Sequence, residues 1–272
     1  MLQVVTRSIS GSILRYLNTP TYRYAPFFGP ELDILARTLK PGDVLLVEGN
    51  TRLSAVIKYL TQSTWSHAAL CIGDALGPAK PGEEPKVLVD AEAGPGVRAV
   101  ALSEFAHFNT RICRPVGLSD EDRHKVVSFA VSRLGTQYDT RQILDLARYL
   151  FPYPPVPVAI RRRLLAIGSG DPTRAICSTL IAEAFYSIRY PILPERIVID
   201  GRTYGVAPYV QGEVEHIRKY GLFTPRDFDV SPYFDVVKPT IERGFDYRAL
   251  TWAPASFDGK TYVDGDYKGR PP

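Results

Sequence analysis

The 272-residue chain lacks a long hydrophobic run, and its best apolar stretches, such as HAALCIG, are short. A membrane-spanning helix needs roughly 18 consecutive apolar residues, so we expect no transmembrane segment. The N-terminus also lacks the uninterrupted apolar stretch and small-residue cleavage site that are typical of a Sec signal. The expected location is therefore cytoplasmic, or exported without a Sec signal.

Cysteine is scarce, with only Cys71, Cys113 and Cys177 in the chain. This odd number, without a CxxC pair or a closely spaced Cys/His set, favours neither a disulfide scaffold nor a zinc site. Cys71 and Cys113 lie in apolar β-prone runs, and we expect both to be inert core thiols.

The sequence also has no long segment in which charges of one sign are concentrated. The net charge is +4 and the basic residues are scattered, apart from Arg161, Arg162 and Arg163, so nucleic acid is not an expected partner. A solvated helix face explains this triplet, and a peripheral contact with anionic lipid is the alternative.

Short β-prone segments separated by Gly, Pro and Asn predict a small, mainly antiparallel sheet. They are DVLLV, SHAALCIG, KVLVDAEAG, GVRAVAL and NTRICRPV. Helical spacing predicts helices in NTRLSAVIKYLTQS, in LSDEDRHKVVSFAVSRLG with Ser119 as its N-cap, and in TRQILDLARYLF, before the proline cluster FPYPPVPV. The fold class is therefore α+β.

The chain shows no internal repeat and no clean linker. We expect a helical or irregular extension over residues 1–38 and a catalytic domain over 39–199. Residues 200–272 are rich in Tyr, Phe, Gly, Pro and Asp, and we expect them to form an irregular extension packed on the same domain.

Cys177 lies at the start of an amphipathic helix in RAICSTLIAEAF. Backbone N–H groups at a helix N-terminus lower the pKa of a thiol and can bind the oxyanion of a tetrahedral intermediate. Cys177 is therefore a candidate nucleophile, and a buried small hydrophobe is the alternative.

A cysteine nucleophile needs a base, and the chain has four histidines. His124 lies on a charged helix surface, while His107 and His216 lie in polar or loop-like segments. His67 opens the apolar strand WSHAALCIG, where an imidazole at a strand start can point from a rigid sheet edge into a cleft. We therefore expect His67 to be the base, and a structural histidine is the alternative.

An acceptor must orient the imidazole, and VLVDAEAGPGV offers two carboxylates. Asp90 and Glu92 are two residues apart in a strand and project from the same face. The spacing alone leaves both open.

These segments together resemble a known family. LKPGDVLL, WSHAALCIG, EAGPGVRAVALSEF, GTQYD and CSTLIAEAF, in this order, are similar to the permuted papain-like amidases of the NlpC superfamily, the YiiX-like group. The resemblance covers about residues 39–190, with a weaker similarity at FTPRDFDVSPYF. It implies a circularly permuted papain-like fold in which the histidine strand precedes the cysteine helix.

Carried over to this chain, the resemblance implies Cys177 as the nucleophile, His67 as the base and Glu92 as the residue that orients His67. It implies a secondary or structural role for Asp90. It also matches Tyr138 to a recurrent family tyrosine that would line the pocket or form a hydrogen bond near the thiolate, and an ordinary core tyrosine is the alternative. The implied activity is cleavage of an amide bond in a peptide or cell-wall peptide through a thioester, with no metal or organic cofactor. A lipid acyl hydrolase or acyltransferase, and a non-catalytic binding module, are the alternatives.

Overall fold

The computed structural model describes residues 16, 18–20, 32–92, 95–137, 176–193, 197–199, 202–204, 223–242 and 244–249. The helix predicted in TRQILDLARYLF and the proline cluster FPYPPVPV lie outside the described residues. None of the described helices has the length and apolar character that a membrane crossing requires.

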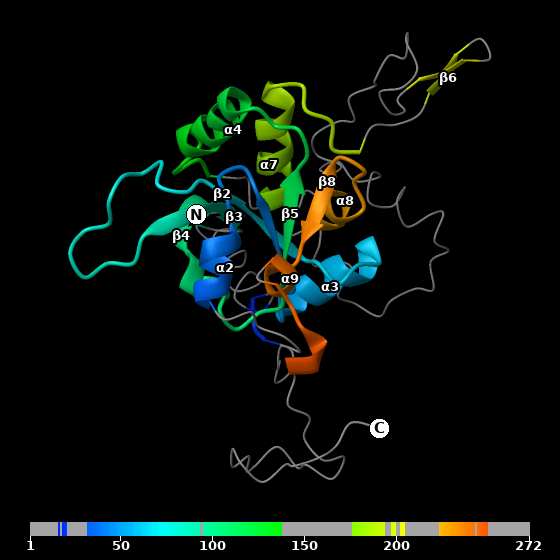
Figure 1. Ribbon diagram of the computed structural model, residues 1–272. Helices are drawn as coiled ribbons and strands as arrows, with labels where there is room; N and C mark the ends of the chain where they lie inside the picture. The colour runs from blue at the N-terminus through cyan, green and yellow to red at the C-terminus, as the bar shows by residue number, and fades with distance from the viewer. Residues whose placement is uncertain are drawn as a thin grey trace, which may run out of the picture.

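A six-stranded antiparallel sheet forms the centre of the structure (Figure 1). Its strands lie in the order β4-β3-β2-β1-β5-β8. They are β1 (Val44–Val47), β2 (His67–Cys71), β3 (Lys86–Glu92), β4 (Gly96–Ala101), β5 (Thr110–Pro115) and β8 (Phe234–Val237). Every neighbouring pair is antiparallel, so the predicted α+β class and antiparallel sheet are confirmed.

Helices cover both faces of this sheet. On one face, α7 (Ile176–Ser187) packs on β2 and β3, and α4 (Asp120–Ser132) lies beside it (Figure 1). On the other face, α2 (Leu32–Thr38) and the 3-10 turn η1 (Leu102–Phe105) contribute Leu35, Leu102 and Phe105 to a second apolar cluster. Because β1 lies in the middle of the sheet and is covered on both sides, all four of its residues are buried.

The remaining described elements are short. They are α3 (Arg52–Thr61), the hairpin of β6 (Ile197–Ile199) and β7 (Arg202–Tyr204), α8 (Pro225–Asp229), α9 (Pro239–Glu242) and the 3-10 turn η4 (Tyr247–Ala249). The predicted cap of α4 is confirmed, because the Ser119 hydroxyl accepts a hydrogen bond from the Asp122 backbone N–H at 3.1 Å.

Within residues 225–237 the C-terminal segment is regular, which corrects the expectation of irregular structure there. β8 adds a sixth strand beside β5, with Phe234 opposite Pro115. Before it, Asp229 at the end of α8 accepts a 3.1 Å hydrogen bond from the Trp65 indole and pairs with Arg111 of β5. These contacts hold the C-terminal segment against the chain that leads into β2.

Gly96, the first residue of β4, lies against the turn that follows α4. It has a φ of +80°, and a Cβ there would collide with the carbonyl oxygen of Thr136. The same carbonyl accepts a 2.9 Å hydrogen bond from Val97 N–H, and Gly135 N–H donates to Val97 O at 2.9 Å. Only glycine allows both this φ and this close approach.

Replacing Gly96 by alanine is therefore expected to reduce the free energy of unfolding by about 2–3 kcal/mol, because the substitution adds backbone strain and a clash. Gly82→Ala is the matched control, since Gly82 has a φ of +85° but nothing within 4 Å of the added Cβ. It is expected to cost only about 1 kcal/mol. Urea unfolding measures both variants, and equal losses would contradict the role of the Thr136 contact.

Candidate active site

Cys177 is the second residue of α7 and is buried, with 3% of its surface exposed. Further along the same helix, Leu180, Ile181 and Phe185 are fully buried against the sheet and fix the helix there. The predicted position of Cys177 at a helix start is therefore confirmed. Its thiol lies where backbone N–H groups carry the positive end of the helix dipole.

His67 is the first residue of β2 and pairs with Val47 of β1. Its ring packs against Phe105 of η1, with centroids 6.1 Å apart. About a quarter of its side chain, 24%, remains exposed. The imidazole is thus held by a central strand on one side and an aromatic ring on another, and it remains accessible to a ligand.

Asp90 of β3 is the acid that contacts the imidazole. Its Oδ2 lies 3.0 Å from His67 Nε2, and its side chain is completely buried. Glu92 instead pairs with Arg98 at 3.1 Å, and 40% of its side chain is exposed. We expected Glu92 to be the acid beside His67, but the acid that contacts the ring is Asp90. Both acids lie on β3 and are paired with β4, but Glu92 is the last residue of the strand and lies opposite Gly96, whereas Asp90 lies opposite Arg98.

Arg98 of β4 lies directly opposite Asp90 in the register of the sheet. Its Nε donates to Asp90 Oδ1 at 3.0 Å and its Nη2 donates to Asp90 Oδ2 at 3.2 Å. Its Nη1 lies 3.3 Å from Glu104 Oε2. Sequence reasoning missed this residue, although an arginine within the apolar strand GVRAVAL was a signal that it has a buried acidic partner.

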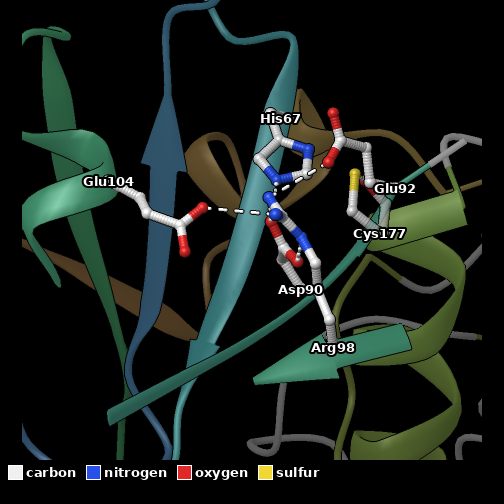
Figure 2. Close-up of polar contacts among 7 residues, drawn as sticks. His67, Asp90, Glu92, Arg98, Glu104 and Cys177 are labelled. Carbon is white, nitrogen blue, oxygen red and sulfur yellow. Dashed lines mark hydrogen bonds and ion pairs between the residues drawn. The ribbon is translucent and has the colours of Figure 1, made fainter. Parts of the chain in front are cut away.

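Figure 2 shows the imidazole between the Cys177 sulfur and the Asp90 carboxylate, with Arg98 lying against Asp90. Since Nε2 faces Asp90, Nδ1 is the ring nitrogen left for the thiol. The structure thus brings together Cys177 and His67, which the sequence predicted as nucleophile and base, with Asp90 as the third group.

The charges in this group stabilise one another. Burial alone would lower the pKa of His67, but the neighbouring Cys177 and Asp90 outweigh it and raise that pKa to about 10. Burial likewise opposes ionisation of Cys177, but His67 and the Ala68 backbone N–H lower the pKa of the thiol. The pair therefore favours a thiolate beside an imidazolium.

The other two cysteines have no such partner. Burial raises the pKa of Cys71 and of Cys113 to about 12, so neither thiol ionises near neutral pH. This agrees with their expected role as core residues. Of the other histidines, His107 and His124 are exposed on the surface.

Three further sequence predictions fall outside the described residues: Tyr138, His216 and the triplet Arg161, Arg162 and Arg163. Within the described part of the chain, no three His, Cys, Asp or Glu side chains are grouped so that they could hold a metal ion.

A comparison with protein-family models agrees with this fold. A family model described as permuted papain-like amidase enzyme, YaeF/YiiX, C92 family, matches residues 38–150. The match includes His67, Asp90 and Arg98 and ends before Cys177. The search of curated proteins found no match.

Among solved structures, the chain is similar to a crystal structure described as that of the metalloprotein yiiX from Escherichia coli O157:H7. The two are 17% identical, with a TM-score of 0.41 over 73% of this chain and 96% of that one. Over residues 38–150, the chain is therefore similar to the YaeF/YiiX family of permuted papain-like amidases.

Proposed function

We propose that Cys177, His67 and Asp90 form the catalytic triad of this amidase and that it cleaves an amide bond in a peptide, such as a cell-wall peptide. One observation carries the proposal. A buried thiol at a helix start and a fully buried carboxylate are both next to the same imidazole, which is itself partly exposed. Each group then has a defined task in acyl transfer.

In the first half of the reaction, the Cys177 thiolate attacks the carbonyl carbon of the amide, and the C=O electron pair moves onto oxygen. The His67 imidazolium then gives its proton to the leaving nitrogen as the C–N bond breaks. An amine leaves and a thioester to Cys177 remains. Asp90 keeps the ring oriented and the imidazolium stable during this transfer.

In the second half, the neutral imidazole takes a proton from water, and the resulting hydroxide attacks the thioester carbonyl. The C–S bond breaks, the acid is released and the thiolate–imidazolium pair is restored. Backbone N–H groups in the first turn of α7 are suited to bind the oxyanion in both halves. Replacing water by another acceptor would turn the same chemistry into acyl transfer.

Selective alkylation is the first test of the triad. With limiting iodoacetamide at pH 7, we expect Cys177 to be alkylated at least about 100-fold faster than Cys71 or Cys113, because only its pKa is lowered. His67→Ala should abolish this preference. Peptide mapping by mass spectrometry identifies the modified thiol, and equally slow alkylation of all three would contradict the proposal.

The choice between the two acids is tested by a matched pair of variants. Asp90→Asn is expected to reduce kcat for a peptide p-nitroanilide on the order of 10²-fold, since it removes the charge that stabilises the imidazolium. Glu92→Gln should change kcat less than about threefold, because Glu92 is half-exposed and pairs with Arg98. The opposite ranking would restore Glu92 as the orienting acid.

The pH dependence of the reaction follows from the two shifted groups. Hydrolysis of the anilide should fall at low pH as the thiolate is protonated, and at high pH as His67 loses its proton near pH 10. Alkylation by iodoacetamide needs no proton donor, so its rate should show the acidic limb only. A fall of both rates at high pH would contradict the role of His67 as the acid.

The substrate class is tested by the adduct on Cys177. Muropeptides and phospholipid vesicles are incubated separately with the protein, and intact mass reports any acyl group that is added. We expect peptide cleavage and a peptidyl adduct that is absent from Cys177→Ala. A fatty-acyl adduct without peptide cleavage would identify a lipid acyl hydrolase or acyltransferase instead, and no turnover of either would favour a binding module.

A further inference from the structure

Arg98 is a charged residue of the site that the proposed mechanism does not use. It forms a two-point hydrogen bond with the buried Asp90 carboxylate, at 3.0 and 3.2 Å. Asp90 Oδ2, which accepts the hydrogen bond from Arg98 Nη2, is also the oxygen that faces His67 Nε2. The guanidinium therefore fixes the rotation of the carboxylate that orients the imidazole (Figure 2).

The charges of the site explain why a cation is needed there. In its reactive form, the triad has two negative groups, Cys177 and Asp90, and one positive group, His67. Cys177 and Asp90 are shielded from water, so an excess negative charge is costly and is relieved by uptake of a proton. If that proton binds the thiolate, the nucleophile is lost.

We propose that Arg98 is a positioning residue that balances the charge of the triad and holds Asp90 toward His67, so that Cys177 can remain a thiolate. This inference rests on the proposed function. With Arg98 present, the four side chains in their ionised forms carry no net charge.

The surroundings of Arg98 keep it in place. Among the described residues, the charged and titratable groups around this assembly are His67 from β2, Asp90 and Glu92 from β3, Glu104 from η1 and Cys177 from α7. Glu92 and Glu104 have side chains that are 40% and 43% exposed, so water screens much of their charge. They hold the outer edge of the guanidinium and contribute less to the balance than the buried Asp90.

A second arginine in the same sheet provides a matched control. Arg114 of β5 makes the same two-point contact with the buried Asp43, at 2.9 and 2.7 Å. Asp43 precedes β1, whereas His67 pairs with Val47 at the other end of that strand. Removing Arg114 thus breaks an equivalent ion pair away from the site, and it reports what such a loss does to stability alone.

The test is the pH midpoint at which Cys177 becomes reactive toward iodoacetamide, measured on the full chain. Arg98→Gln is expected to raise this midpoint by about one pH unit, since loss of a nearby cation makes protonation of the thiolate more favourable. Arg98→Lys retains the charge and should stay within about 0.3 unit of the wild type. Arg114→Gln should leave the midpoint unchanged.

A second variant keeps the test valid if Arg98→Gln is poorly folded. Arg98→Met retains the apolar stem of the side chain but lacks its charge, so its midpoint should also rise by about one pH unit. An unchanged midpoint in folded Arg98→Gln, or equal shifts in Arg98→Gln and Arg98→Lys, would overturn the inference while leaving the triad intact. Absence of preferential Cys177 alkylation in the wild-type protein would overturn the triad itself.

Discussion

The Asp90 carboxylate is the group on which the candidate site depends. It is fully buried, and both of its oxygens accept hydrogen bonds from Arg98, while Oδ2 also lies 3.0 Å from His67 Nε2. Burial works against its charge, but His67 and Arg98 hold its pKa below the ordinary value. An acid that stays ionised in the interior keeps its partner imidazole protonated, and the imidazolium in turn favours a thiolate at Cys177.

The fold supplies the rigidity that this arrangement needs. β2, β3 and β4 are adjacent in the sheet and carry His67, Asp90 and Arg98, so hydrogen bonds of the sheet fix the spacing of three groups. α7 packs on β2 and β3 and brings Cys177 to the same place from late in the chain. The histidine strand precedes the cysteine helix in the chain, which is the order that the resemblance to permuted papain-like amidases implies.

Much of this arrangement could be predicted from the sequence. Apolar periodicity located the start of α7 and thus Cys177, and the strand WSHAALCIG located His67. The choice between Asp90 and Glu92 could not be made, because residues two apart in a strand share a face and only tertiary burial separates them. Arg98 was missed for a related reason, since its partner depends on the register between β3 and β4. β8 was missed because its four residues, FDVV, are too few to show a period.

The protonation state of His67 at rest tests this account most directly. An ordinary imidazole, with a pKa of about 6.5, is neutral at pH 8. The site described above instead keeps both ring nitrogens of His67 protonated at that pH, because Asp90 and the Cys177 thiolate stabilise the cation. Nitrogen-15 NMR of the labelled imidazole distinguishes the two forms. A doubly protonated His67 ring at pH 8 is the predicted result, and a neutral ring would contradict the ion pair on which the proposed mechanism rests.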